Sequence, residues 1–158
     1  MDNQKYVKSA PVIIGCDHAA FPLKEKIKSF LVDATIEVKD VGTFSEQSVN
    51  YAEYGMKVAS KISRGEFTRG ILLCGTGLGM SMVANRFPHV RAALCSDIFS
   101  AQMSRYHNDS NILVLGGRVI GETLAMELVR NWLETPFLGE RHQDRLATFD
   151  TIPSEEGI

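Results

Sequence analysis

The 158-residue sequence has no long apolar run and no block of like charges, and each absence removes a class of protein. Without an apolar stretch long enough to cross a bilayer, we expect no membrane span. The net charge of −2, spread without a basic or acidic run, argues against nucleic acid or an anionic membrane as a partner. The polar N-terminus lacks the apolar core of a signal peptide, so we expect a cytoplasmic protein.

Cysteine is scarce, and the three that are present do not suit a disulfide framework, because their number is odd. Cys16, Cys74 and Cys95 each lie at the end of a predicted strand, where we expect reduced thiols. Cys16 and Cys95 lie inside apolar runs and are interpreted as core residues. Cys74 differs, because a glycine-rich turn follows it directly.

The sequence also lacks both common nucleotide-binding glycine motifs. Gly75, Gly77 and Gly79 are evenly spaced and do not match G-x-G-x-x-G, and no G-x-x-x-x-G-K-[ST] run exists. We therefore expect an anion smaller than a dinucleotide or a nucleoside triphosphate.

Metal-ligand spacings are missing as well. A four-ligand set of Asp17, His18, Cys74 and His107 can be imagined, but none of the usual spacings supports it. We therefore expect no metal.

Strand-like and helix-like segments alternate along the chain. Strands are expected at Val12–Asp17, Ile36–Val41, Ile71–Cys74, Val90–Cys95 and Asn111–Leu115. Helices are expected at Ala20–Val32, Tyr51–Ser63, directly after the glycine-rich turn, Ile98–Tyr106, Gly121–Leu133 and Glu140–Thr148. The pattern predicts an α/β fold: a Rossmann-like, doubly wound, five-stranded parallel sheet in three α/β/α layers. We expect a single domain over residues 1–158, with a disordered extension at residues 1–10 and a tail at residues 149–158.

The most informative segment is Arg69–Arg86, RGILLCGTGLGMSMVANR. A buried strand ends at Cys74, and Gly75–Gly79 let the backbone turn tightly and approach a ligand. A helix that starts here directs unpaired N–H groups at the turn, which makes an anion site and favours a thiolate. One loop could thus hold a charged substrate and present a base to it. The alternative is that Cys74 is a small packed apolar residue.

Other polar residues follow the predicted strands, where ligands bind in parallel α/β sheets. Asp17 and His18 follow the first strand, Asp97 the fourth and Arg118 the fifth. Asp17 is equally suited to cap a helix, and Asp97 is interpreted as a cap.

His107 and Asn108 lie in the turn SRYHNDSN. Turn formation explains the asparagines but not the histidine.

Arg141 and Arg145 stand four residues apart, so one helical face carries both. With Arg118 they could clamp a phosphate, because the guanidinium fork pairs with its oxygens. The alternative is a solvated face paired with Glu140 and Asp144. A symmetric dimer could bring this tail into a neighbour's pocket.

Five segments in this order resemble the family of type B ribose-5-phosphate isomerases and galactose-6-phosphate isomerase subunits: GCDHAAFPLK, LLCGTGLGMSMVANR, RAALCSD, SRYHNDSNILVLGGRVIG and ERHQDR. The similarity runs from about Val12 to about Thr148. It implies a homodimer, sometimes a tetramer, with active sites shared between subunits. It also implies interconversion of ribose 5-phosphate and ribulose 5-phosphate through an enediolate, without metal or cofactor.

The resemblance implies roles for individual residues. Cys74 matches the proton-abstracting base, and His107 matches the acid that assists ring opening. The loop that holds the enediolate matches Gly75, Thr76, Gly77, Leu78 and Gly79, with Thr76 counted among the catalytic residues. The remaining substrate contacts match Asp17, His18, Tyr51, Asn108, Arg118, Arg141 and Arg145, with His18 and the arginines mostly on the phosphate.

Two alternatives stay open. The first is isomerisation of a six-carbon sugar phosphate, such as allose 6-phosphate or galactose 6-phosphate, decided by the loop around Gly42–Tyr51. The second is a non-catalytic sugar-phosphate-binding protein, which would not need Cys74 or His107.

Overall fold

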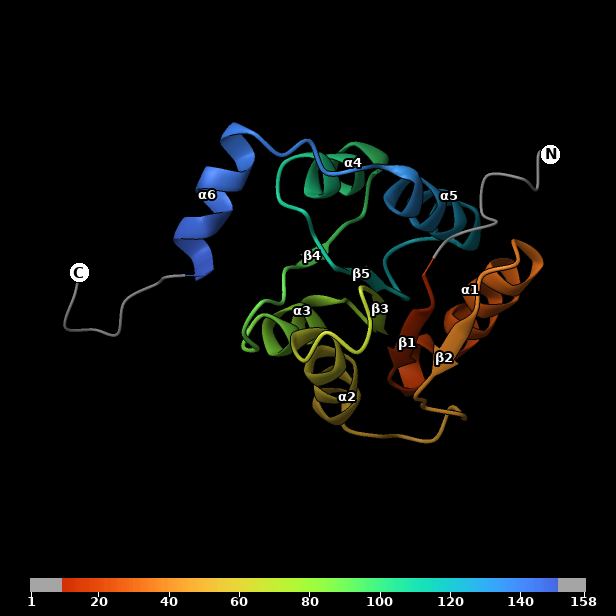
Figure 1. Cartoon of the computed structure of the whole chain (residues 1–158). Coiled ribbons are helices and arrows are strands. Elements are labelled where there is room, and N and C mark those ends of the chain that lie inside the picture. Colours follow the sequence, from red (N-terminus) through yellow and green to blue (C-terminus); the bar gives the residue numbers. More distant parts are fainter. Residues whose placement is uncertain (1–9, 151–158) are drawn as a thin grey trace.

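The structure is a computed structural model that describes residues 10–150 (Figure 1). Residues 1–9 of the predicted extension and residues 151–158 of the predicted tail lie outside the described residues. The strands are β1 (Val12–Cys16), β2 (Val38–Asp40), β3 (Arg69–Cys74), β4 (Ala92–Leu94) and β5 (Ile112–Gly116). They form one sheet in the order β2-β1-β3-β5-β4, and every neighbouring pair is parallel.

The helices follow the predicted alternation closely. They are the 3-10 turn η2 (His18–Ala20), then α1 (Phe21–Asp33), α2 (Tyr51–Ser63), α3 (Leu78–Ala84), α4 (Ile98–Tyr106), α5 (Glu122–Glu134) and α6 (Arg141–Asp150). The last helix runs two residues past the predicted end, so Phe149 and Asp150 of the predicted tail belong to it. Within residues 10–150, no helix is both long and apolar enough to cross a bilayer.

The sheet is buried on both faces, which explains why its inner strands are continuously apolar. On one face, Ile27, Leu31 and Trp132 of α1 and α5 pack with Ala101 of α4. On the other face, Val58 of α2 and other apolar residues of α2 and α3 form a second cluster. Figure 1 shows α2 and α3 on the side of the sheet opposite α1 and α5. The predicted three-layer, Rossmann-like α/β fold is confirmed.

The connections after β1 and β3 leave the sheet on opposite faces. The segment after β1 leads through η2 into α1 and the first cluster, whereas the segment after β3 leads into α3 and the second. Because β1 and β3 are neighbours, the two connections diverge at their carboxyl ends, which makes this the switch point of the sheet. This is the position at which an open α/β sheet binds its ligand.

Candidate active site

The carboxyl end of β3 carries Cys74 into a turn made almost entirely of backbone. Gly77 has a φ of 79°, a left-handed conformation that favours glycine. A Cβ atom at Gly77 would lie 2.4 Å from Cδ1 of Leu94, so the site has no room for a side chain. The turn folds the Gly77 N–H back onto Cys74 Sγ, to which it donates a hydrogen bond of 3.1 Å.

Cys74 is only 5% exposed in the single chain, and it contributes to the core cluster beneath α2 and α3. Its neighbours on the turn are more accessible: Gly75 is half-buried and Thr76 is exposed. Thr76 Oγ1 accepts the N–H of Leu78 at 3.3 Å, which supports the first turn of α3. The sulfur therefore lies at the inner wall of the turn, with a small part of Cys74 still accessible.

The end of β1 brings two polar side chains beside this turn. Asp17 is 6% exposed, and its Oδ1 accepts the N–H groups of Ala19 and Ala20, so it caps η2 as one interpretation predicted. Its own N–H donates to the Leu73 carbonyl at 3.1 Å, which joins the end of β1 to β3. His18 follows, and its Nδ1 accepts the N–H of Val49 at 3.2 Å. With Nδ1 as an acceptor, the N–H donor of the ring is at Nε2.

The loop that supplies Val49 is fixed by a fully buried lysine. Lys24 Nζ donates to Asp40 Oδ2 at 2.6 Å and to the Thr43 carbonyl at 2.8 Å. Thr43 N–H in turn donates to the Cys16 carbonyl at 2.8 Å. The loop around Gly42–Tyr51 is thus anchored to α1 and to the end of β1.

Tyr51 and Arg118 close the turn from two sides. A Cβ at Gly79 would lie 2.5 Å from Cε2 of Tyr51, so the tyrosine ring lies directly against the glycine. A Cβ at Gly75 would lie 3.6 Å from Cδ and 3.8 Å from Nη1 of Arg118. The Arg118 N–H also donates to the Gly75 carbonyl at 2.9 Å. We call Asp17, His18, Tyr51, Arg118 and the turn Cys74–Gly79 the thiol group.

The other predicted residues gather elsewhere, at the junction of α4 and α6. His107, Asn108 and Arg145 line one cavity together with His142, Thr148 and Phe149. The rings of His107 and His142 are stacked, with centroids 4.4 Å apart and planes 12° from parallel. Burial of His142, with the positive charge of His107, Arg141 and Arg145 nearby, lowers its pKa below the ordinary value. We call His107, Asn108, Arg141 and Arg145 the histidine group.

The two groups lie at opposite edges of the sheet. Cys74 is the last residue of β3, and Asp97, which caps the start of α4, lies after β4 at the same edge of the sheet. Helix α4 then runs back across the sheet, so His107 at its far end lies near Ile112, where β5 begins. Helix α6 projects away from the body of the molecule (Figure 1). One chain therefore keeps the two groups of predicted site residues apart.

The arginines of the histidine group do not form the ion pairs of the alternative interpretation. Arg141 and Arg145 are exposed, and within residues 10–150 neither is paired with Glu140 or Asp144. Their charge is available to an anion.

The sequence and the fold match a known family of enzymes. Residues 12–149 match the sequence profile of the Ribose/Galactose Isomerase family. Ribose-5-phosphate isomerase B of Escherichia coli is 45% identical over 141 residues, which cover 89% of this chain and 95% of the relative. A crystal structure of a ribose 5-phosphate isomerase from Thermotoga maritima superimposes with a TM-score of 0.89 at 50% identity, covering 92% of this chain and 100% of that one. The chain belongs to the ribose/galactose isomerase family.

Members of the ribose/galactose isomerase family differ in the substrate after which they are named. A 4-deoxy-4-sulfo-D-erythrose isomerase from a Clostridium species is 43% identical over 127 residues, which cover 80% of each chain. The relationship makes this chain a sugar phosphate isomerase of the family.

The four residues weighed from the sequence as metal ligands are not brought together by the fold. Among residues 10–150, no three His, Cys, Asp or Glu side chains are grouped to hold an ion. His107 lies at the opposite edge of the sheet from Asp17, His18 and Cys74, so these four cannot meet in one chain.

Sequence reasoning missed His142. It lies between the two predicted arginines in ERHQDR, and its burial and its stacking on His107 make it part of the same cavity. Its position between two predicted phosphate-binding arginines was the one sequence feature that could have indicated it. Burial of one face of α6 could not be inferred from so polar a segment. Cys16 and Cys95 are buried, as predicted. Burial raises the pKa of Cys16 to about 12 and that of Cys95 to about 11.

Proposed function

We propose that this chain interconverts ribose 5-phosphate and ribulose 5-phosphate, with Cys74 as the base and each active site shared between two copies of the chain. One observation carries the proposal: the thiol lies at the carboxyl end of β3, beside β1, inside a turn that directs a backbone N–H at its sulfur. The names of the Escherichia coli and Thermotoga maritima relatives support the choice of substrate.

Each of the two groups, a half-site in this proposal, supplies a different part of the chemistry. In the thiol group, the Cys74 thiolate takes the proton from C2 of the open-chain aldose. Negative charge then grows on the carbonyl oxygen, where backbone N–H groups of the Gly75–Gly79 turn are suited to stabilise it. The hydroxyl proton of O2 then passes to O1, the C1–C2 double bond of the enediolate gives way to a carbonyl at C2, and the proton held by Cys74 is delivered to C1, which completes the exchange of aldose for ketose. No net oxidation occurs, because hydrogen and charge only move within the substrate.

The histidine group serves the cyclic form of the sugar. The C1–O4 bond of the furanose breaks, and its electron pair leaves with O4, which takes a proton from His107. The C1 hydroxyl passes its proton to water and becomes the aldehyde. Arg141 and Arg145 hold the phosphate, since their forks match its oxygens. Arg118 and the Nε2–H of His18 add donors from the thiol group.

Sharing of the site follows from the distance between the half-sites. A single chain keeps the base and the acid at opposite edges of its sheet, where they cannot act on one sugar. A two-fold pair of chains contacts itself through the same surface on both copies, so the histidine group of one can complete the thiol group of the other. The projecting α6 is the element best placed to reach a neighbour (Figure 1).

A second candidate substrate is favoured by the comparisons. The family name includes galactose, and one relative is named for a sulfo sugar. Substrates with a six-carbon chain or a sulfonate in place of the phosphate would use the same base and the same arginines. The loop around Gly42–Tyr51, anchored by Lys24, would set the space left for the sugar.

The test combines a substrate panel with one variant. Ribose 5-phosphate, allose 6-phosphate, galactose 6-phosphate and 4-deoxy-4-sulfo-erythrose are assayed side by side in D2O. Deuterium entering C2 of the recovered aldose reports proton abstraction directly. Cys74→Ala should lower turnover by roughly 10²–10⁴-fold and abolish exchange, as loss of a general base does.

Cys95→Ala is the matched control, since that thiol is also buried but lies after β4, outside both half-sites. It should keep both exchange and turnover. Turnover near wild type in Cys74→Ala would reject the cysteine base. A higher kcat/KM for another sugar of the panel would reject ribose 5-phosphate while keeping the mechanism.

A further inference from the structure

The turn that presents His107 and Asn108 has an unusual backbone. Asp109 adopts a φ of 44°, in the left-handed region that a residue other than glycine seldom occupies. Its N–H donates to the Arg105 carbonyl at 3.2 Å, and the Ser110 N–H donates to the Ser104 carbonyl at 2.9 Å. The chain therefore turns sharply after α4 before it enters β5.

A buried arginine holds the turn from inside. Arg105 is 2% exposed, and its Nη1 donates to Asp109 Oδ1 at 2.7 Å and to the Ser110 carbonyl at 2.6 Å. Its Nε donates to the Thr135 carbonyl at 3.3 Å, so the same side chain reaches the end of α5. Trp132 lies beneath, with Nε1 donating to Ser110 Oγ at 2.8 Å.

A second arginine holds the turn from the side of β4. Arg91 Nη2 donates to Asp109 Oδ2 at 3.1 Å. Its Nε is shared between the carbonyls of Asn108 and Asp109, at 3.0 and 3.2 Å. The two carboxylate oxygens of Asp109 are thus taken by different arginines from different elements. We call Arg91, Arg105 and Asp109 the clasp.

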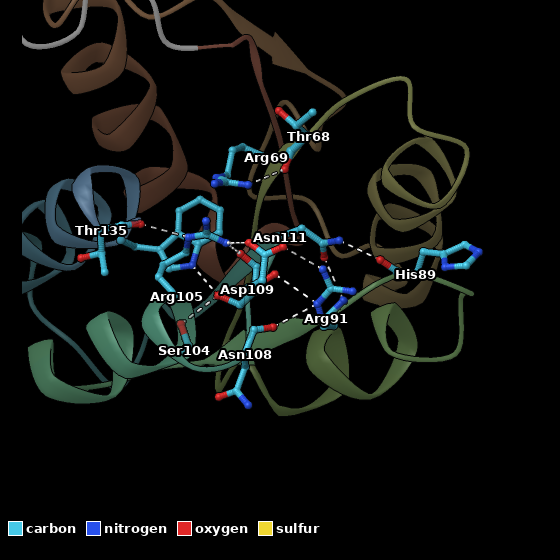
Figure 2. A network of polar contacts seen from close by, with 12 residues as sticks. Thr68, Arg69, His89, Arg91, Ser104, Arg105, Asn108, Asp109, Asn111 and Thr135 are labelled. Atoms are coloured by element: carbon cyan, nitrogen blue, oxygen red, sulfur yellow. Dashed lines mark hydrogen bonds and ion pairs between the residues drawn. The ribbon is translucent and has the colours of Figure 1, made fainter. Parts of the chain in front are cut away.

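The arginines of the clasp bond backbone carbonyls of the turn. The side chains of His107 and Asn108, which are predicted to face the substrate, take no part in these bonds. Figure 2 shows Arg91 and Arg105 converging on Asp109, while the Asn108 side chain points away from both. Asn108 is exposed and lines the cavity that also contains His107 and Arg145. The hydrogen bonds of the clasp fix the backbone from which the side chains of His107 and Asn108 extend. They do not involve these two side chains.

We propose that the clasp is a positioning device for sugar-ring opening, holding His107 and Asn108 at the angle needed to serve the neighbouring subunit's thiol group. The proposal rests on the proposed function, in which His107 is the acid. Arg91, Arg105 and Asp109 do not touch the substrate. They act through the turn, and a small misplacement of an acid can cost on the order of 10²-fold in rate.

Arg91→Lys is the most informative variant. Lysine keeps the positive charge beside Asp109 but lacks the fork, so it cannot bond the carboxylate and both carbonyls together. Arg91 is partly exposed, with 21% of its side chain accessible, which limits the effect on folding. Arg64→Lys is the matched control, because Arg64 pairs with Glu66 through a similar contact on the surface after α2.

The experiment is a double-mutant cycle on the full-length protein. Arg91→Lys, His107→Ala and the double variant are compared with wild type for kcat and KM on ribose 5-phosphate, with thermal melting to check folding. In the wild-type background, Arg91→Lys should lower kcat by about ten-fold or more with little change in KM. In the His107→Ala background the same change should cost less than about two-fold, since the group it positions is gone. Arg64→Lys should change neither.

Each outcome decides between the two proposals. Equal kcat losses from Arg91→Lys in both backgrounds, or no loss in either, would overturn the clasp. A His107→Ala variant with wild-type turnover would overturn the proposed function instead, and the clasp with it. Asp109→Asn, which tolerates the left-handed backbone, enters the same cycle if Arg91→Lys does not fold. Its effect should likewise vanish without His107.

Discussion

Gly79 shows how one missing side chain shapes the thiol group. A Cβ there would lie 2.5 and 2.6 Å from two ring atoms of Tyr51, closer than any real contact allows. Gly79 lies inside α3 with an ordinary helical backbone, so its role is space and not conformation. The tyrosine ring is partly exposed, and it can move aside where a buried ring could not.

We therefore expect Gly79→Ala to displace Tyr51 without unfolding the protein. KM for the sugar phosphate should rise several-fold because the tyrosine no longer faces the turn. The melting temperature should stay the same or rise slightly, since alanine favours a helix by about 1 kcal/mol over glycine. Gly121→Ala, at a position with no atoms within 4 Å of the added carbon, is the control and should leave KM unchanged. An unchanged KM in Gly79→Ala would exclude Tyr51 from the site.

At the scale of elements, α1 and the loop after β2 are joined through charge in an apolar setting. Lys24 is fully buried in the first turns of α1, between the rings of Phe21 and Phe44. Burial opposes ionisation of Asp40, but hydrogen bonds from Lys24, the Gly42 N–H and Lys28 outweigh it and lower the pKa of the carboxyl. The ionised pair therefore stabilises the fold, and with it the loop that contacts His18.

This pair predicts a pH dependence of stability. A carboxyl whose pKa is lowered by folding stabilises the protein above its unfolded pKa, near 3.8, and this contribution is lost as the pH falls through the lower folded value. Urea unfolding of wild type should show a free energy of unfolding that declines below about pH 4. In Asp40→Asn the decline should be shallower.

At pH 7, Asp40→Asn should be less stable than wild type by at most roughly 3–5 kcal/mol, the range for breaking a buried pair. Lys24 keeps the Thr43 carbonyl and Glu25, which limits the loss. Glu66→Gln, which removes a surface pair with Lys61 and Arg64, is the control and should be nearly neutral at that pH. Parallel pH profiles for Asp40→Asn and wild type would contradict the argument.

At the scale of the whole molecule, the separation of the half-sites predicts complementation between inactive variants. If each site is shared between two chains as proposed, Cys74→Ala and His107→Ala each disable every site in their own dimers. In a mixed dimer, however, one site combines the intact thiol of one chain with the intact histidine of the other. Random re-association should restore about a quarter of wild-type activity, because half of the dimers are mixed and each holds one intact site of two.

The measurement is activity after the two purified variants are mixed, unfolded together and refolded. Each variant refolded alone is the control, and neither should gain activity. If the mixture stays as inactive as its components, each site is built from one chain, and the shared-site proposal is wrong.

The sequence alone determined the features that depend on neighbouring residues. The bounds of α2 and α4 were predicted to the residue, because an asparagine or aspartate cap precedes a periodic apolar face in each. The order of strands and helices, the glycine turn after Cys74 and the burial of Cys16 and Cys95 followed from runs a few residues long. β2 and β4 came out shorter than predicted, since each is an edge strand with only one partner.

The tertiary structure decided which of these residues meet. It placed Cys74 and His107 at opposite edges of one sheet, buried Lys24 against Asp40, stacked His142 on His107 and closed Arg91 and Arg105 on Asp109. Such contacts join residues on different elements, and their energies depend on burial and angle. A linear pattern does not encode these quantities, because they exist only once the sheet and its helices have packed.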